Sequence, residues 1–301
     1  MTDSFTIRPA TRKGIVPLIA LYSESGCGKT YSSLLMARGI VGPSGKIVMI
    51  DSESGRGELY ADMPTVAPYD VIPLDAPFHP SRYIAAIEAA ENSGAGAIVV
   101  DSGSHEWEGP GGVLDMAGDN EERTKKAGLH NWKKPKFEHA LLVSKLLRVK
   151  VPIIVCLRAK YKSRQGKNDS GATVIFKDDK TSPIQADDFI FEATAHAEIL
   201  PNHSIILTKC SHPNLRSCFP TEGPICVEHG RKIAEWCLGS DESSDIREAK
   251  RIIWDKLKGA HKTKEGVQQF LWDEALMELE TNLETASLVQ LREIVSKLSK
   301  K

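Results

Sequence analysis

The sequence predicts an α/β fold built on a mainly parallel β-sheet, and three observations support this class. Short, continuously apolar runs alternate along the chain with segments of helix-forming residues, which is the pattern of parallel strands covered on both faces. The first apolar run ends in a glycine-rich loop, residues 23–30, that opens a helical segment. A later apolar run, residues 97–101, ends in the carboxylate of Asp101. We therefore expect polar side chains to gather at the carboxyl edge of the sheet.

Each predicted element follows from a local pattern. The strands are buried runs rich in Val, Ile and Leu, and the helices between them carry apolar or small residues on one side. Gly39 and the pair Gly42-Pro43 end the first helix. In chain order we predict strand 15–22, helix 29–40, strand 46–51, helix 83–90, strand 97–101, helix 140–149 and strand 151–157.

After residue 185 the long apolar runs give way to shorter stretches in which apolar and polar residues alternate. Residues 189–200 and 204–209 flank Pro201-Asn202-His203 and are typical of a β-hairpin. We therefore expect the sheet to end in two antiparallel strands.

A polar stretch, residues 237–244, is a candidate domain boundary because it contains Gly and Ser between two patterned segments. It divides the chain into a core, residues 1–238, and a small helical appendage, residues 245–301. Two apolar stripes at helical spacing run through the appendage, and such stripes are typical of core or partner contacts.

Composition excludes several protein classes. The chain has 301 residues, 41% hydrophobic and 26% charged, with a formal net charge of −1. The composition is that of an ordinary globular protein. The length is sufficient for about two domains. The longest apolar run, residues 151–157, is too short to cross a membrane, and the first residues lack the pattern of a secretory signal. We expect a cytoplasmic protein whose six cysteines are reduced thiols.

The glycine-rich loop Ser-Glu-Ser-Gly-Cys-Gly-Lys-Thr matches the P-loop pattern G-x-x-x-x-G-K-[ST] except at Ser23, which replaces the first glycine. Gly26 and Gly28 allow backbone N–H groups to surround phosphate oxygens at a helix N-terminus. Lys29 is expected to reach the β- and γ-phosphates, and the Thr30 hydroxyl to hold Mg²⁺. The predicted cofactors are therefore ATP and Mg²⁺. The candidate nucleotide-binding residues are Ser25, Gly26, Cys27, Gly28, Lys29, Thr30 and Tyr31.

Carboxylates that follow the buried strands are candidates for two roles, orienting Mg²⁺ and orienting the attacking water. Asp101 ends an apolar strand, as does the acidic residue that orients Mg²⁺ in P-loop enzymes, so Thr30 and Asp101 are the predicted metal-holding pair. Hydrolysis also needs an acid that orients water. Glu53 and Glu106 are the two candidates, and either could instead be a solvated loop residue.

Several segments of the chain resemble known families. The P-loop, Ile50-Asp51-Ser52-Glu53 and Val99-Val100-Asp101-Ser102 occur in an order that resembles the RecA-like ATPases. Further segments resemble a family of phage and prophage ATP-binding proteins, itself similar to the RecA-like single-strand annealing and recombination ATPases. These segments are residues 101–107, 111–115, 131–132, 157–160 and 208–210. The resemblance covers about residues 5–240.

This resemblance implies roles for residues that the motifs alone leave open. It favours Glu53 over Glu106 as the catalytic acid, because the acid of RecA-like ATPases follows the second strand. It implies a ring or filament of identical subunits, in which a basic residue reaches the γ-phosphate held by a neighbour. Lys209 is the first candidate for that residue and Arg216 the second. Arg158 is the candidate for sensing the phosphate within its own subunit.

Two basic segments stand out against the near-zero net charge. Residues 123–150 contain nine Lys or Arg and one acid, and residues 158–180 contain seven bases and three acids. Aromatic residues lie among the lysines, a combination that holds phosphates while stacking bases, although a solvated helix face has the same pattern. The resemblance implies that the loops after the third and fourth strands, here 102–138 and 159–183, line a channel for single-stranded DNA. The candidate nucleic-acid-binding residues are Trp132, Lys133, Lys134, Lys136, Lys160, Lys162 and Arg164.

A zinc site is not expected, because the nearby cysteines and histidines lack the paired spacings of zinc ligands. These residues are Cys210, His212, Cys218, Cys226 and His229.

The sequence thus predicts an ATP-binding and ATP-hydrolysing RecA-like core that acts on single-stranded DNA in recombination, annealing or replication. One alternative is a helicase-like or packaging-type motor with the same core. Another is a nucleotide-dependent module that binds partners through its C-terminal helices without turning ATP over.

Overall fold

The computed structural model describes residues 7, 12, 14–167, 173–257, 263–273, 283, 286 and 288–300. The chain divides into two compact units. One spans Val16–Ala234, and the other combines the described residues of Met1–Ile15 and Glu235–Lys301. Each unit has its own core.

The larger unit alternates strands and helices, with two short 3-10 helices, η1 and η2. Its elements in chain order are β1 (Leu18–Ser23), α1 (Lys29–Val41), β2 (Ile47–Asp51), η1 (Arg56–Tyr60), β3 (Asp70–Pro73), α2 (Pro80–Asn92), β4 (Ala97–Asp101), α3 (Ser104–Glu108), α4 (Val113–Thr124), η2 (Leu129–Trp132), α5 (Lys133–Leu146), β5 (Ile153–Lys167), β6 (Thr173–Pro183), α6 (Phe189–Glu192), β7 (Ala195–Ile199), β8 (Ile205–Cys210) and α7 (Pro213–Arg216). Helix α8 (Val227–Leu257) begins in this unit and is interrupted at Gly239, where φ is 88°.

The sheet is mainly parallel. Its strand order is β3-β2-β4-β5-β1-β7-β8, and β6 pairs with β5 outside this path. Two pairs of the described strands are antiparallel, β5 with β6 and β7 with β8. The register sets Ser23 opposite Arg158 and Asp51 opposite Asp101, so the polar residues that end these strands meet at one edge. The predicted α/β class with a mainly parallel sheet is confirmed.

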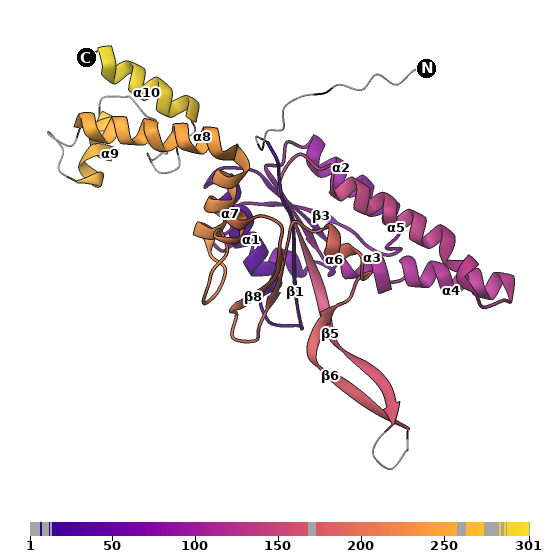
Figure 1. The fold of residues 1–301 in the computed structure, drawn as a ribbon. Coiled ribbons are helices and arrows are strands. Elements are labelled where there is room, and N and C mark those ends of the chain that lie inside the picture. The colour runs from indigo at the N-terminus through magenta and orange to yellow at the C-terminus, as the bar shows by residue number, and fades with distance from the viewer. Residues whose placement is uncertain are drawn as a thin grey trace. The chain divides into compact units, whose positions relative to one another are not determined.

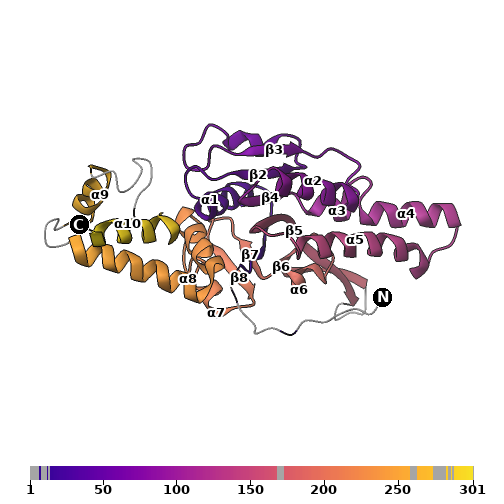
Figure 2. The same cartoon turned by 90° about the horizontal axis from the view of Figure 1, so that it is seen from above.

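Helices cover the two faces of the sheet. Residues of α2 and α5 pack with alternate residues of β1, β2, β4 and β5 in one large apolar cluster. Helix α1 lies on the opposite side of the strands (Figure 1; Figure 2 gives the view from above). There, α1 crosses the start of α8 where Gly39 meets Gly230, and a Cβ on Gly39 would lie 1.9 Å from the Val227 carbonyl oxygen. Both glycines are required by this close approach of two backbones.

The expected hairpin of two antiparallel strands at the end of the sheet is confirmed by β7 and β8, whereas three other expectations about the elements were wrong. Residues 102–138 fold into α3, α4, η2 and the start of α5 rather than a loop, and residues 159–183 form most of an antiparallel hairpin. The first residues of the expected strand 189–200 form helix α6 instead. Strand β7 joins the β7–β8 hairpin to the rest of the sheet by pairing parallel with β1, and β8 forms the edge.

Strands β5 and β6 continue beyond the sheet as a two-stranded arm, which leaves the body of this unit in Figure 1. Their pairing runs from Ala159 opposite Pro183 to Lys167 opposite Thr173, with an irregularity after Tyr161.

The smaller unit is helical in its described part. The C-terminal half of α8, α9 (Lys264–Asp273) and α10 (Leu288–Lys300) share an apolar core that includes Ile253, Leu271 and Leu291, each fully buried. Within the part of the chain that the structure covers, no helix is both long enough and apolar enough to cross a membrane.

Candidate nucleotide-binding site

The P-loop connects β1 to α1 at the carboxyl edge of the sheet. Gly26 and Gly28 have φ of 85° and 92°, in the left-handed region that favours glycine. No side chain caps the N-terminus of α1, and its first turn holds no acidic residue. The first amides of α1 are therefore available to an anion, and the helix dipole favours one there.

Lys29 folds back onto its own loop. Its Nζ donates to the Ser23 carbonyl oxygen at 3.1 Å, the Ser23 Oγ at 3.2 Å and the Glu24 carbonyl oxygen at 3.0 Å. Ser23, at the position where the pattern has glycine, thus supplies Lys29 with an additional acceptor. All three acceptors are neutral, so a phosphate oxygen is a stronger partner for this ammonium group.

Thr30 and Asp101 meet directly beside the loop. The Thr30 hydroxyl donates to Asp101 Oδ2 at 2.5 Å, joining the start of α1 to the end of β4. Burial raises the pKa of Asp101 to about 6, while the Thr30 hydrogen bond and the Lys29 charge oppose this shift. A hydroxyl and a carboxylate are hard oxygen ligands of the kind that Mg²⁺ prefers. The residues present therefore fit Mg²⁺ with a nucleotide.

The loop after β2 is fixed by buried hydrogen bonds. The Ser52 N–H donates to the Asp101 carbonyl oxygen at 2.7 Å, which joins the ends of β2 and β4. Buried Asp51 accepts from the Glu53 N–H at 2.7 Å and from the Gly57 N–H at 3.1 Å. These bonds hold the backbone at Glu53 at the carboxyl edge of the sheet.

The Glu53 carboxylate is held by Arg158 at the point where β5 leaves the sheet. Arg158 Nε donates to Oε1 at 3.0 Å and Nη2 to Oε2 at 2.9 Å. His105 Nε2 lies 3.8 Å from the same carboxylate. Burial raises the pKa of Glu53, but the hydrogen bonds and charge of Arg158, with His105 and Arg56, outweigh it, so the pKa is below its ordinary value. Glu53 is an ionised acid at neutral pH.

Glu106, the other candidate acid, has different partners. It is fully buried, and its carboxylate accepts from His139 Nδ1 at 3.0 Å and from Gln185 Nε2 at 3.1 Å. Helix α3 therefore places His105 beside Glu53 and the next residue, Glu106, against α5.

The remaining predicted loop residues differ in exposure. Ser25 is exposed, whereas the Cys27 side chain is buried, which leaves its backbone groups to face a ligand. The Tyr31 ring stacks on Tyr60 with centroids 5.5 Å apart, and its hydroxyl lies 3.0 Å from Thr65 Oγ1. Tyr31 thus joins α1 to the segment that follows η1.

One residue at the loop escaped the sequence analysis. His203, in the turn between β7 and β8, has Nδ1 3.0 Å from the Cys27 carbonyl oxygen, and a Cβ on Gly28 would lie 3.2 Å from that atom. The hairpin was expected, but not the parallel pairing of β7 with β1 that brings its turn to the P-loop. The pairing, and not any motif, is the signal that would have found it.

The two candidates for a residue shared with a neighbour differ in their contacts. Lys209, near the end of β8, donates to the carbonyl oxygens of Ile190 at 3.2 Å and Ala193 at 2.7 Å and also to that of Phe191. It therefore closes the C-terminal end of α6 in its own chain. Arg216 ends α7 and is exposed.

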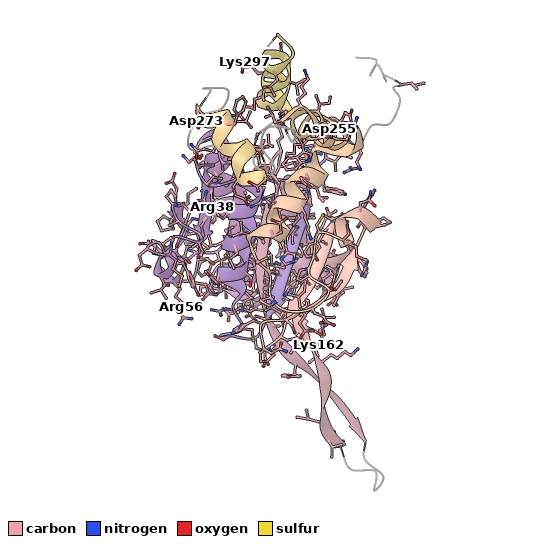
Figure 3. The ribbon with its side chains drawn as sticks, turned by 90° about the vertical axis from the view of Figure 1, so that its left-hand side faces the viewer. Arg38, Arg56, Lys162, Asp255, Asp273 and Lys297 are labelled. Carbon is pink, nitrogen blue, oxygen red and sulfur yellow. The ribbon has the colours of Figure 1, made fainter. Side chains whose placement is uncertain are left out.

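The predicted nucleic-acid-binding residues fall into two places. Trp132 and Lys136 line a pocket beside α5, while Lys133 and Lys134 are exposed at its first turn. Lys160 and Lys162 lie on β5 where the arm begins, 3.5 Å from Glu108 and 3.1 Å from Asp187 respectively (Figure 3 labels Lys162). The side chain of Arg164 lies outside the described residues.

Among the described residues, no three or more His, Cys, Asp or Glu side chains gather in a way that could hold a metal ion. Cys226 Sγ and His229 Nδ1 lie 3.2 Å apart as a pair.

Comparison with known families agrees with this geometry. A family model described as an AAA domain matches residues 17–188, which is more than half of the chain. A comparison with curated proteins gave no match. The matched range contains the P-loop, Glu53, Asp101 and Arg158. The chain therefore belongs to the AAA domain family of P-loop NTPases.

Proposed function

We propose that this protein binds ATP with Mg²⁺ at the P-loop and hydrolyses it in response to single-stranded DNA. The observation that carries the nucleotide site is the 2.5 Å contact between Thr30 and Asp101 beside the uncapped N-terminus of α1. The amides of the loop and Lys29 would bind the phosphates, and Thr30 and Asp101 would hold the metal ion. When bound, Mg²⁺ neutralises charge that develops on the phosphate oxygens.

Glu53 is proposed to orient the attacking water. Its carboxylate is ionised and lies at the same edge of the sheet, but Arg158 occupies both of its oxygens. We expect turnover to require that Arg158 exchange this carboxylate for another anion, for which the γ-phosphate of ATP has the right charge. This arrangement supports an ATPase that is slow until it is activated.

Single-stranded DNA is the proposed activator, and the arm is its proposed binding surface. Lys160, Lys162 and Lys180 are exposed on β5 and β6. The ion pairs of Lys160 and Lys162 with acids are solvent-exposed and therefore weak, so phosphates can replace them. The resemblance to phage annealing and recombination ATPases supports a role in recombination, annealing or replication, in an oligomer of identical subunits.

The experiment is phosphate release with and without single-stranded DNA, run on the full chain. We expect stimulation by DNA, and loss of both ATP binding and turnover in Lys29→Ala. Lys160→Ala with Lys162→Ala should weaken DNA binding and reduce the slope of log affinity against log salt by about 1.4, because each contact with a single-strand phosphate contributes about 0.7 through released counterions. Lys46→Ala with Lys297→Ala is the matched control, since both lysines are exposed and each pairs with one acid. An unchanged slope in the arm variant would contradict the DNA assignment.

A second candidate function is supported by the same contact between Glu53 and Arg158. A permanent ion pair would leave a protein that binds ATP and partners without hydrolysis. Tight ATP binding with no phosphate release, with or without DNA, would favour this nucleotide-dependent binding module.

A further inference from the structure

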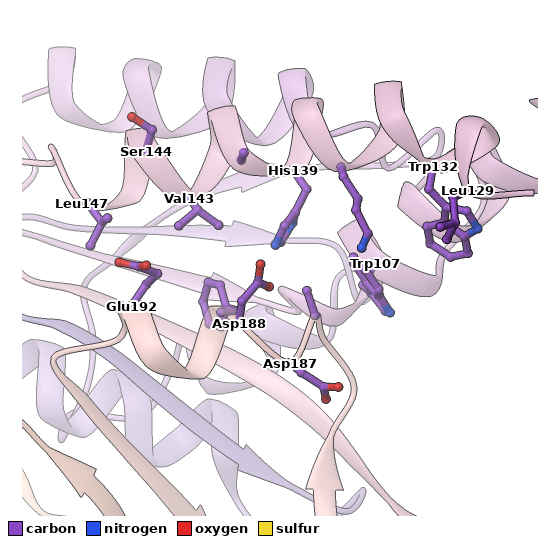
Figure 4. Close-up of a pocket in the computed structure, with 14 residues that line it drawn as sticks. Trp107, Leu129, Trp132, His139, Val143, Ser144, Leu147, Asp187, Asp188 and Glu192 are labelled. Carbon is purple, nitrogen blue, oxygen red and sulfur yellow. The ribbon is translucent and has the colours of Figure 1, made fainter.

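A second pocket lies apart from the P-loop, between α5 and the segment that leads into α6 (Figure 4). Its volume is about 720 Å³, which is within the range of small-molecule sites. None of its lining residues belongs to the P-loop or is Thr30, Glu53 or Asp101. Any occupant of this pocket would therefore be distinct from the nucleotide phosphates.

One side of the pocket is aromatic. Trp107 from α3 and Trp132 from η2 have ring centroids 6.5 Å apart, and both line the cavity. Trp107 also meets the ring of His139 edge-on, with centroids 5.4 Å apart. Indole faces attract cations and pack well on apolar groups.

The other side is acidic. Asp187, Asp188 and Glu192 line the pocket and are exposed, and Figure 4 shows them across from the side chains of α5. Lys162 lies 3.1 Å from Asp187 at the outer edge, and Lys136 is the basic residue of the lining. The acids outnumber this lysine, so phosphate groups would be repelled. This disfavours a nucleic-acid role for Trp132 and Lys136 inside the cavity.

His139 supplies an independent sign of a missing ligand. Its side chain is 6% exposed and points from α5 into the space between α5 and α6 in Figure 4. Its Nδ1 lies 3.0 Å from the Glu106 carboxylate, which accepts hydrogen bonds, so Nδ1 carries the hydrogen. The other nitrogen, Nε2, is buried and has no hydrogen-bond partner within the described part of the chain. In the neutral ring, Nε2 is an acceptor that needs a donor, either N–H or O–H, and the acidic side of the pocket favours the N–H of a cation.

From these observations we infer that the pocket binds an organic cation, an ammonium or guanidinium group carried on an apolar or aromatic body. The body packs against the wall formed by Trp107 and Trp132, an N–H of the ligand donates to His139 Nε2, and the positive charge faces Asp188 and Glu192. A free small molecule and a basic side chain of a peptide share this chemistry. The inference does not depend on nucleotide binding or hydrolysis.

The first arm of the test uses three probes with one ring system, measured by calorimetry on the full chain. They are 1-naphthylmethylammonium, the neutral 1-naphthylmethanol and the anionic 1-naphthylacetate. We expect the cation to bind at least about tenfold more tightly than the alcohol, and the anion not to bind. Equal affinities, tighter binding of the anion or no binding of the cation would overturn the inference.

The second arm uses variants. Asp188→Asn with Glu192→Gln should weaken binding of the cation at least about tenfold, because two facing charges are removed without a change of shape. Asp119→Asn with Glu122→Gln makes the same charge change on α4, outside the lining, and should leave the affinity unchanged. His139→Asn places an amide near the position of Nδ1 and deletes Nε2, so it should also weaken binding. If His139→Asn fails to fold, the acid pair and its control still decide.

The third arm distinguishes a free small cation from a basic side chain of a peptide, and the pocket from the P-loop site. N-acetyl-phenylalanyl-lysinamide carries the same charge on a peptide, and binding more than tenfold tighter than that of the naphthyl cation would indicate a peptide partner. The reverse order would indicate a free small cation. Lys29→Ala should bind the cation as the unmodified protein does, so a failed ATP assay leaves this result intact. Loss of cation binding in Lys29→Ala would overturn the assignment of a separate site.

Discussion

Arg158 holds both carboxylate oxygens of Glu53, with donor–acceptor distances of 3.0 and 2.9 Å, across the carboxyl edge of the sheet. The two residues are 105 positions apart in sequence, and only the pairing of β5 beside β4 and β1 brings them together. A two-point pair of this kind fixes the direction of the carboxylate as well as its charge. Glu53, the acid proposed to orient the attacking water, is thus engaged by Arg158 in this structure.

Replacing Glu53 tests its role. Glu53→Gln should bind ATP with near-unchanged affinity and lose about 100-fold or more of its hydrolysis rate, because the amide cannot accept a proton from water. Single-turnover phosphate release measures this. Glu106→Gln is the comparison, and we expect a milder effect on turnover because that carboxylate contacts His139 and Gln185. A larger loss in Glu106→Gln than in Glu53→Gln would contradict the assignment.

The affinity for ATP with Mg²⁺ should fall as pH drops through about 6. Burial raises the pKa of Asp101 to that value, so below it the carboxyl group is neutral and a poor metal ligand. The raised pKa also means that the nucleotide-free protein loses stability as pH rises through 6. Asp101→Asn should then raise the free energy of unfolding at pH 8 by up to about 3 kcal/mol while abolishing the effect of Mg²⁺. Titrations with ATP at pH 5.5 and 7.5, and urea unfolding, check the two parts.

A site shared between subunits should show complementation. Because Lys209 closes α6 in its own chain, we now expect the exposed Arg216 to be the better donor to a neighbour. Arg216→Ala and Lys29→Ala should each lack activity, and their mixture should recover activity above the sum of the two, since some sites combine an intact P-loop with an intact donor. No recovery in mixed oligomers that demonstrably form would leave Arg158, acting within its own subunit, as the candidate.

His196 should make the fold sensitive to mild acid. It stacks on Tyr22 with ring centroids 4.5 Å apart, and burial, helped by the charge of Lys209, lowers its pKa to about 4. An ordinary histidine titrates near 6.5, so the unfolded chain binds the proton first and stability is lost as pH falls from about 6.5 towards 4. The loss should reach about 3 kcal/mol.

Urea unfolding at pH 4.5 and 7.5 measures this effect. His196→Asn keeps an amide near Nδ1, which lies 2.8 Å from Thr208 Oγ1. Because buried Asp101 has the opposite effect in this pH range, the variant should lose only the acid-induced destabilisation, so its free energy of unfolding at pH 4.5 rises relative to that at pH 7.5 when compared with the unmodified protein. His79→Asn, at the partly exposed histidine that caps α2, should keep the pH dependence of the unmodified protein. Equal slopes in all three proteins would show that His196 does not carry the effect.

Local pattern was enough to predict the parts of the site that are close in sequence. The P-loop, the start of α1 at Lys29 and the apolar strand that ends at Asp101 each follow from a few neighbouring residues, because glycine, buried runs and helix formers act locally. The contacts of Glu53 and His203 depend on which strands pair and in which direction, and no short segment encodes that. The arm was mistaken for a loop because its polar sequence contains no continuous apolar run of the kind that marks the buried strands.

Strand β5 belongs to two structures at once. Up to Arg158 it pairs with β1 in the sheet, and from Ala159 it pairs with β6 in the arm. The change of pairing partner falls directly after Arg158, the residue that holds the Glu53 carboxylate. The first residue of the arm is therefore the direct neighbour in sequence of the residue that holds Glu53, and no loop separates the two.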